Sequence, residues 1–407
     1  MFDAIIVGGG AAGLTTAIML KRRSPELKVA IIEQLDRVGK KLSVTGNGRC
    51  NITNGSIEDK NYYSTSHKKA MEILKSFSAK KTEDFFSSIG VEIAFENTKA
   101  YPRSFQASSV VDALRFTVQG LNVELFTSTK VLDIKYTNNI FNIFCENSSS
   151  FKAKTVVIAT GGLAGGNKLG SNGDGYKFLE KTGHNIIPKS PVIVQVKTEN
   201  TVTKSLKGIK VNAYVSVVQS GKVLSSDFGE VLFCDYGLSG PPILQLSRYC
   251  KIGTQIVLDM FCEFETEKLT NLLLKRREIL KGIPLTEFFA GLLHKRIGQA
   301  ILKLCGFSLS NFCESLTNMD CENIAKTLKE FKFKVTGNTG FVNAQATSGG
   351  ADLKSFDNGL MSKKCAGLFA VGEVLDVDGD CGGYNLQWAW SSANRVANSI
   401  ATFLGRN

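Results

Sequence analysis

The sequence predicts an α/β fold in which both ends of the chain contribute to one domain. Three observations predict it. A glycine-rich motif follows the first apolar segment, further glycine-rich motifs occur in the middle and near the C-terminus, and the hydrophobic spacing between them changes from strand-like to helix-like. The chain has 407 residues, more than the ~100–200 residues of one ordinary domain. We therefore expect a second domain inserted into the first.

The opening segment has the pattern of a βαβ unit that binds a dinucleotide. Residues Asp3–Val7 form an apolar stretch typical of a buried strand, and Gly8, Gly10 and Gly13 follow in G-x-G-x-x-G spacing before a helical pattern. The first glycine permits a tight turn, the second lets a pyrophosphate approach the backbone, and the third lets the helix pack closely on the strand. With Ala12 in its first turn, the helix would bind the diphosphate at its N-terminus.

A second apolar strand, Val29–Ile32, ends at the acid Glu33. This acid lies 20 residues beyond Gly13, where a ribose-binding carboxylate is expected. A carboxylate there accepts hydrogen bonds from ribose hydroxyls and repels a 2′-phosphate. The pattern therefore favours FAD or NAD over NADP as the dinucleotide.

The segment from Val38 to Asn54 extends this site. It carries Lys40, Lys41, Gly48 and Arg49. Its glycines allow the backbone to pass close to a ring system, and its cations supply charge for a phosphate or an anionic flavin.

Later segments of the sequence indicate which of the two dinucleotides is bound. Thr155–Gly162 is an apolar strand that runs into an Ala-Thr-Gly-Gly turn, and Gly170–Tyr176 is a glycine-rich loop that enters a helix. Near the C-terminus, Gly367–Glu373 precedes Gly382–Gln387. The Ala-Thr-Gly-Gly turn and the C-terminal motif resemble those of FAD proteins of the glutathione-reductase structural class.

Together these segments resemble the family of bacterial FAD-dependent oxidoreductases that includes the bile-acid reductase BaiN and the aminoacetone oxidases. The resemblance covers nearly the whole chain. It implies a Rossmann-like FAD-binding domain of the glutathione-reductase type, and it implies that the backbone near Val131 touches the adenine. The FAD contacts expected in the later motifs are Ala159, Thr160, Gly161, Gly372, Glu373, Gly383, Asn385 and Leu386.

The C-terminal motif departs from its usual form at one position. Glu373 stands where an Asp is usual, and its longer side chain can point elsewhere. Asp376 is therefore an alternative contact for the ribityl chain.

The middle of the chain is predicted to be the insertion. Stretches such as Val211–Val218, with a hairpin turn at Ser220–Lys222, indicate a β-barrel or sheet layer. From about 266 to 331 the hydrophobic period is helical, most clearly where apolar residues lie three or four apart from Leu285 to Ile297 and end near Gly306, and we expect this face to be packed rather than membrane-bound. Strand-like residues return at 331–335 and 340–344. The expected domains are an FAD domain at 1–190 and 346–407, a β-rich domain at 191–265 and 331–345, and a helical lid at 266–330.

Catalytic candidates are the polar residues expected at the flavin ring. Arg49 and Tyr384 are the first choices for a substrate anchor and a proton donor, although either could contact only the cofactor. The helix beginning near Asn385 would point its positive end at the flavin pyrimidine. Cys50 lacks the paired cysteine of the disulfide reductases, so we interpret it as a packed thiol.

Composition argues against several other classes of protein. The net charge is +12, but the basic residues are scattered in short pairs, which argues against nucleic-acid binding. The chain has three widely separated histidines and ten cysteines without C-x-x-C spacing, so we expect no metal site and reduced thiols. The uncharged run Ala4–Leu20 follows an acid and contains four glycines, so we expect a cytoplasmic protein without a signal peptide or membrane span.

Three functions stay open at this point. The first is a reductase that takes hydride from NADH or NADPH and passes it to a conjugated enone, such as a 3-oxo-Δ4 or Δ6 bile acid or steroid. No second G-x-G-x-x-G is present, so the nicotinamide would bind transiently against the flavin. The second is a flavin oxidase of a small amine of the aminoacetone type, and the third is a basic RNA-binding flavoprotein.

Overall fold

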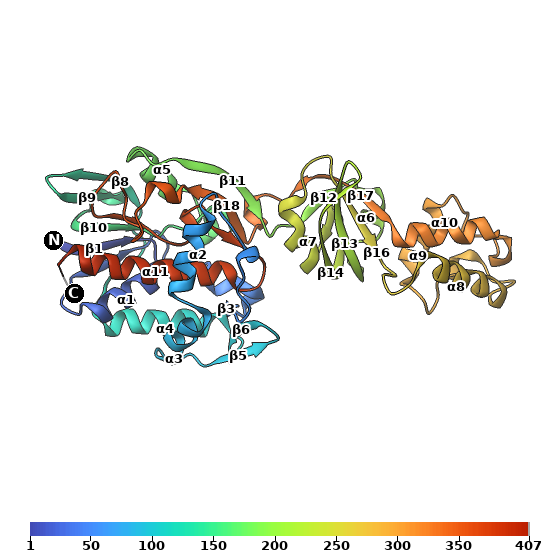
Figure 1. Ribbon diagram of the computed structural model, residues 1–407, viewed down its shortest axis with the longest axis horizontal. Helices are drawn as coiled ribbons and strands as arrows, with labels where there is room; N and C mark the ends of the chain where they lie inside the picture. Colours follow the sequence, from blue (N-terminus) through green and yellow to red (C-terminus); the bar gives the residue numbers. More distant parts are fainter. Residues whose placement is uncertain (406–407) are drawn as a thin grey trace. The chain divides into compact units, whose positions relative to one another are not determined.

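The structure, a computed structural model, describes residues 1–405 (Figure 1). The chain forms two compact units. The first consists of Met1–Val192 and the chain from Phe341 onward, and the second is Ile193–Gly340. Both ends of the chain thus build one α/β unit around an insertion, and the predicted fold class is confirmed.

The central sheet of the first unit joins the two ends of the chain. Its order is β7-β2-β1-β10-β9-β8, and β19 pairs with β10. Its strands are β1 (Phe2–Val7), β2 (Val29–Ile32), β7 (Glu124–Phe126), β8 (Val131–Thr137), β9 (Ile140–Cys145), β10 (Ser150–Ile158) and β19 (Leu368–Ala370). Val7 and Ala370 both lie opposite Ile158 in parallel register. The glycine-rich motifs that follow these three strands therefore emerge at one edge of the sheet.

Within residues 1–405, the first unit contains six α-helices: α1 (Ala11–Arg23), α2 (His67–Ser76), α3 (Ala79–Ser87), α4 (Ala107–Gly120), α5 (Asp174–Lys181) and α11 (Tyr384–Phe403). Helix α11 lies alongside α1 (Figure 1). Two fully buried tryptophans fix α11 in place: the Trp388 indole N–H donates to the Gly372 carbonyl (3.0 Å), and the Trp390 indole N–H donates to the Ile52 carbonyl (2.9 Å). A largely apolar helix thus holds two of the glycine-rich segments by their backbones.

Three small sheets complete the first unit. Their strands are β3 (Thr53–Asn54), β6 (Lys99–Pro102) and β5 (Ile93–Glu96) in one sheet, β4 (Tyr62–Tyr63) and β20 (Asp378–Gly379) in the second, and β11 (Ile186–Val192) and β18 (Ala346–Ala351) in the third. The first of these sheets contains residues 93–102, and its residues contact Arg49 in the candidate site.

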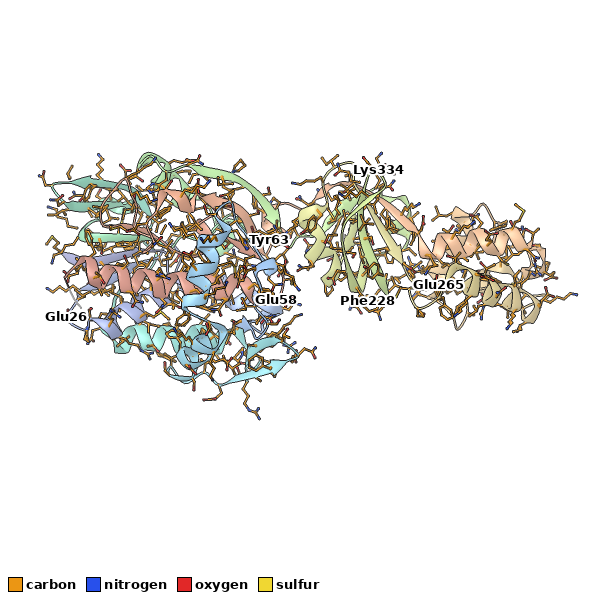
Figure 2. All side chains as sticks on the ribbon, in the orientation of Figure 1. Glu26, Glu58, Tyr63, Phe228, Glu265 and Lys334 are labelled. Carbon is orange, nitrogen blue, oxygen red and sulfur yellow. The ribbon has the colours of Figure 1, made fainter. Side chains whose placement is uncertain are left out.

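The second unit contains a closed barrel in the order β12-β15-β14-β13-β16-β17. Its strands are β12 (Val196–Thr198), β13 (Lys210–Gln219), β14 (Lys222–Cys234), β15 (Gly237–Ser239), β16 (Gln255–Asp259) and β17 (Phe331–Asn338). Alternate residues Ala213, Val215 and Val217 are buried, whereas Phe228 lies on the surface (Figure 2). The predicted hairpin turn is confirmed, since Ser220 and Gly221 join β13 to β14 with positive φ.

The helices of the second unit are α6 (Asn200–Ser205), α7 (Pro241–Leu246), α8 (Thr266–Ile279), α9 (Lys295–Leu304) and α10 (Asn318–Lys329). The continuous helix predicted from Leu285 to Ile297 is wrong, because α9 begins only at Lys295. A single 3-10 turn covers Leu285–Glu287, and Gly291 takes a positive φ of 78°. Leu285, Phe288, Phe289 and Ile297 are nevertheless buried, and Leu292 and Leu293 are partly buried, which explains the helix-like spacing.

The strand predicted at 340–344 is also wrong. Gly340 has a φ of 79° and its N–H donates to the Asn338 side chain (2.9 Å), so the chain turns as it leaves the barrel. A 3-10 turn at Phe341–Asn343 follows. Among residues 1–405, no helix has the length and apolar character needed to cross a membrane.

Candidate functional site

The first glycine-rich motif forms a backbone cradle at the start of α1. A Cβ at Gly8 would lie 2.5 Å from the Ala159 carbonyl oxygen, and a Cβ at Gly13 would lie 2.0 Å from the Gly8 oxygen. A Cβ at Gly10 would instead meet no heavy atom within 4 Å. Gly10 is also the N-cap of α1 and supplies no side chain to its first N–H groups. Open space beside unpaired N–H groups suits a diphosphate.

Glu33 is held at the end of β2 by backbone hydrogen bonds. The N–H groups of Gly9 and Leu35 each donate to its carboxylate at 2.8 Å. Burial raises the pKa of Glu33, and the hydrogen bonds from Leu35 and Gly9 oppose that rise. The acid expected to bind ribose thus lies against the glycine motif, with a fixed orientation.

The residues after Glu33 meet the segment expected to touch adenine. The Thr129 N–H donates to the Glu33 carbonyl (2.9 Å), which places Val131 two residues further along at the start of β8. Gln34 donates to the Gly170 carbonyl (2.8 Å) and accepts a hydrogen bond from Asn172 (2.9 Å).

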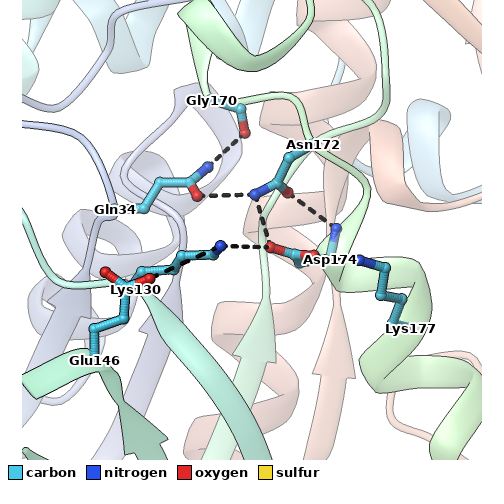
Figure 3. A network of polar contacts seen from close by, with 7 residues as sticks. All are labelled: Gln34, Lys130, Glu146, Gly170, Asn172, Asp174 and Lys177. Carbon is cyan, nitrogen blue, oxygen red and sulfur yellow. Dashed lines mark hydrogen bonds and ion pairs between the residues drawn. The ribbon is translucent and has the colours of Figure 1, made fainter.

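Figure 3 shows how this network continues to the next elements. Asn172 also donates to Asp174 (2.7 Å), whose carboxylate faces Lys177 at 2.8 Å and Lys130 at 4.0 Å. The network joins β2, β8 and the loop before α5. Three segments that are distant in sequence are therefore joined by one polar network beside Glu33.

The C-terminal motif reaches the N-terminal motifs through Glu373. Its carboxylate lies 2.5 Å from the Lys41 ammonium and accepts a hydrogen bond from the Thr347 N–H (2.7 Å). A Cβ at Gly372 would lie 2.9 Å from the Ala12 Cβ, and one at Gly161 would lie 3.9 Å from Glu373 Oε2. The structure thus brings Ala12, Lys41, Gly161 and Glu373 close together.

Two predicted contacts have other partners in the structure. Lys40 pairs with Asp36 at 3.4 Å on the surface. The buried Asp376 carboxylate accepts hydrogen bonds from Thr65 N–H (2.9 Å) and Thr65 Oγ1 (2.6 Å), and burial raises its pKa. Sequence reasoning missed Thr65 and Thr347, because a threonine outside any motif carries no signal of such a role.

Unpaired polar atoms lie next to the glycine motifs. Thr160 Oγ1 and Asn51 Oδ1 are buried without a hydrogen-bond partner. A Cβ at Gly175 would lie 1.9 Å from the first, and a Cβ at Gly383 would lie 2.8 Å from the second. Because buried polar atoms normally have partners, this unmet capacity beside the backbone cradle fits a polar ligand such as FAD.

The start of α11 is shaped by its own side chains. Gly383 is the N-cap with a φ of 96°, and Asn385 fixes the preceding turn by accepting from the Gly379 N–H and donating to the Gly379 carbonyl, both at 2.9 Å. Leu386 follows in the first turn and is partly buried. The helix presents uncapped N–H groups, which favour an electron-rich ring edge.

The three reactive candidates lie in different surroundings. The Tyr384 hydroxyl donates to the Ser56 carbonyl (3.0 Å), and burial raises its pKa. Arg49, which follows the open backbone at Gly48, pairs with Glu96 at 2.6 Å. Cys50 is fully buried, and burial raises its pKa to about 12, so its thiol has little nucleophilic thiolate.

Comparison with known proteins gives matches along nearly the whole chain. Residues 2–399 match the family described as HI0933-like protein Rossmann domain. A 3-dehydro-bile acid delta(4,6)-reductase of Clostridium scindens is 32% identical and covers 97% of this chain and 98% of its own. A ribosomal RNA dihydrouridine synthase of Escherichia coli is 30% identical and covers 98% of both chains.

One solved structure illustrates the fold. A flavocytochrome c3 fumarate reductase in its open conformation aligns with a TM-score of 0.52 at 14% identity, covering 99% of this chain and 78% of its own. The chain therefore belongs to the HI0933-like Rossmann-domain family, and it is a flavin-dependent oxidoreductase.

Proposed function

We propose that the protein uses FAD to reduce a carbon–carbon double bond conjugated with a carbonyl group, with NADH or NADPH as the electron donor. The observation that carries the proposal is the full-length similarity to two relatives whose names describe such a reduction. A 3-dehydro Δ4,6 bile acid contains a conjugated enone, and dihydrouridine is uridine with its C5–C6 double bond reduced. The two substrates differ in size but share the reacting group.

The first unit supplies the residues that would hold FAD. The diphosphate would bind at Gly8, Gly10, Ala12 and Gly13. Glu33 would bind the ribose, and the backbone at Val131 would contact the adenine. The ring and ribityl chain would lie against residues of the other motifs: Lys41, Gly48, Ala159, Thr160, Gly161, Gly372, Glu373, Asp376, Gly383, Asn385 and Leu386. Lys40, which pairs with Asp36 on the surface, and Arg49, which pairs with Glu96, would not be needed to hold FAD. When bound, FAD would carry the hydride between donor and acceptor.

The chain itself must provide a proton and a fixed substrate. Reduction of a conjugated double bond adds hydride to one carbon and a proton to the other. We assign the proton to Tyr384, because its hydroxyl lies in the motif expected at the flavin ring and carries a proton at neutral pH. Arg49 is assigned to anchor the substrate, since it lies in the segment from Val38 to Asn54 and its side chain is partly exposed.

The leading substrate class is a 3-oxo-Δ4 or Δ6 bile acid or steroid. A second class, uridine in RNA, is favoured by the net charge of +12 together with the similarity to the ribosomal RNA enzyme. A net positive charge speeds the association of RNA with the protein, but it does not determine where on the surface the RNA binds.

An anaerobic spectrum of the FAD-loaded protein tests the function. NADH or NADPH should bleach the flavin, and either a 3-oxo-Δ4 bile acid or a uridine-containing ribosomal RNA transcript should restore its absorbance with formation of the saturated product. Oxygen serves as the comparison acceptor. A flavin that neither nicotinamide reduces, or that only oxygen reoxidises, would contradict the proposal.

A further inference from the structure

We propose that Arg49 binds an oxyanion carried by the substrate, a carboxylate or a phosphate, and that Glu96 occupies this position until the substrate displaces it. The inference rests on the proposed function, because it assigns a specificity element to the same site. It concerns four residues of the first unit, Arg49, Glu96, Tyr101 and Phe105, here called the arginine clamp.

Two neighbouring aromatic rings of the clamp pack against the guanidinium. The Arg49 Cζ lies 4.4 Å from the Tyr101 ring centroid and 4.6 Å from the Phe105 ring centroid. The two ring centroids are 5.7 Å apart and tilted by 42°. Contacts of this kind orient a guanidinium and restrict its motion. The fork of N–H donors is thereby pre-organised for a planar, two-oxygen acceptor.

Glu96 is the acceptor in this structure. Its carboxylate lies 2.6 Å from Arg49, and the side chains of Arg49 and Glu96 are 38% and 49% exposed. Ion pairs with this much exposure contribute little net stability. A substrate oxyanion can therefore replace Glu96 at small cost and meet an arginine that is already oriented.

The backbone around the clamp is conformationally costly. Asn47, Cys50 and Phe105 have φ values of 55°, 56° and 51°, in the left-handed region that non-glycine residues seldom adopt. Gly46 and Gly48 are left-handed as well. Such conformations persist when the surrounding structure enforces them, and they concentrate at functional sites. Here they set the position of Arg49.

The clamp borders the turn that precedes α11. Burial raises the pKa of Tyr101, the charge of Arg49 opposes the rise, and Glu96 and then Cys381 add smaller increases, so Tyr101 and Cys381 are neighbours. A Cβ at Gly382 would lie 3.6 Å from Lys99 Cε. Within residues 1–405, no acceptor is paired with the Lys99 ammonium. A second cation thus lies beside this turn, which also carries the Asp380 carboxylate.

The oxyanion has two possible sources within the proposed function. A bile acid carries a carboxylate on its side chain, and RNA carries phosphates on either side of a uridine. Both fit the guanidinium fork. Charged and neutral forms of each substrate distinguish the sources.

The first test measures the reactivity of Arg49 in oxidised, FAD-loaded protein. Phenylglyoxal modification is followed by peptide mass spectrometry with 3-oxo-4-cholenate, its methyl ester, a uridine trinucleotide or uridine added. The charged member of at least one pair should slow Arg49 modification about three- to tenfold, and its neutral partner should not.

Arg115 is the matched control for this measurement. It stacks on Phe116 at 4.4 Å and pairs with Asp112 at 3.2 Å, with side chains 36% and 52% exposed. Its modification should be unaffected by all four compounds. Protection of Arg115 to the same extent as Arg49 would show non-specific shielding and overturn the proposal.

The second test removes the competing carboxylate. Glu96→Gln should tighten binding of the protective anion about three- to tenfold, whereas Asp112→Asn should leave it unchanged. Arg49→Lys should weaken binding of the anion and leave FAD retention as in the wild type. Because Glu96 is exposed on β5, its variant tests the proposal even where an Arg49 variant folds poorly.

Three results would overturn the proposal: equal Arg49 modification with all four compounds, equal protection by charged and neutral partners, or loss of FAD in Arg49→Lys. Protection by the carboxylate alone identifies a bile-acid side chain, and protection by the trinucleotide alone identifies an RNA phosphate. No turnover is involved, so a failed anion test is distinct from a flavin that NADH fails to reduce.

Discussion

The Lys41 ammonium and the Glu373 carboxylate lie 2.5 Å apart, although 332 residues separate them in the chain. Their side chains are 26% and 19% exposed, so the pair is partly shielded from water. It connects the segment after the first βαβ unit with the C-terminal motif. The candidate cofactor site therefore draws on residues from both ends of the chain.

Lys41→Met is expected to lower FAD affinity about tenfold, because it leaves the Glu373 charge unpaired beside an anionic dinucleotide. Equilibrium dialysis with FAD measures the change. Lys40→Met is the control, since Lys40 pairs with the exposed Asp36 and should change affinity no more than about twofold. An equal loss of FAD affinity in both variants would show that FAD binding depends on the total positive charge and not on the Lys41–Glu373 pair.

Gly10→Ala and Gly13→Ala are expected to fail in different ways. A Cβ at Gly10 meets open space, so this variant should keep the stability of the apoprotein and lose FAD. A Cβ at Gly13 would lie 2.0 Å from the Gly8 oxygen, so the second variant should lose about 1–3 kcal/mol of stability. Urea unfolding of the apoprotein and the flavin spectrum separate the two effects. FAD binding by Gly10→Ala at wild-type strength would mean that the diphosphate lies elsewhere.

The sequence predicted the features that depend on local conformation. Gly8 and Gly13 must be glycines because backbone atoms lie against them, and this requirement is visible as a spacing. The partners of Glu373 were not predictable, because no pattern relates Lys41 or Thr347 to a residue so distant in sequence. The aromatic rings around Arg49 lie on another segment and carry no motif.

In the inserted unit, a sequence pattern predicted a helix that the structure does not contain. Hydrophobic spacing reports burial, and the buried residues of this stretch lie in a turn and loop (Leu285, Phe288, Phe289) as well as in α9 (Ile297). A three-to-four spacing therefore predicted a helix where the chain is irregular. Gly291, with its positive φ, is a local signal of the break.

Cys50 is expected to be unreactive and dispensable for catalysis. Iodoacetamide at pH 8 should label the exposed Cys262 and leave Cys50 unlabelled in the folded protein, as mass spectrometry can show. Cys50→Ala should reduce its flavin with NADH at a rate within about twofold of the wild type. Rapid labelling of Cys50, or loss of flavin reduction in the variant, would restore it as a redox candidate.

The raised pKa of Cys50 also predicts a pH effect on stability. Its folded value of about 12 lies above the ordinary value of 9.0. Between these values the folded state keeps a proton that the unfolded chain releases, so the thiol lowers stability as the pH rises above about 9 and has no such effect below it. Urea unfolding of the wild type and Cys50→Ala at pH 8 and pH 10 measures the difference, and an equal loss in both proteins would contradict it.

Tyr384 and its neighbour Tyr62 offer a matched pair of hydroxyl deletions. The Tyr384 hydroxyl donates to the Ser56 carbonyl (3.0 Å), and the Tyr62 hydroxyl donates to the Tyr384 carbonyl (3.1 Å). Each phenylalanine variant should lose about 1 kcal/mol of stability, since each removes one hydrogen bond. The rings also meet edge to face at 5.7 Å, a contact that both variants keep.

Only Tyr384→Phe should slow the transfer of electrons to the conjugated acceptor, by about a hundredfold or more, if its hydroxyl supplies the proton. Reduction of the flavin by NADH should be unaffected, because that step needs no proton from the protein. Stopped-flow absorbance separates the two half-reactions in Tyr384→Phe and Tyr62→Phe. Equal reoxidation rates in both variants would assign Tyr384 a structural role, because its hydroxyl would then do no more than hold the Ser56 carbonyl.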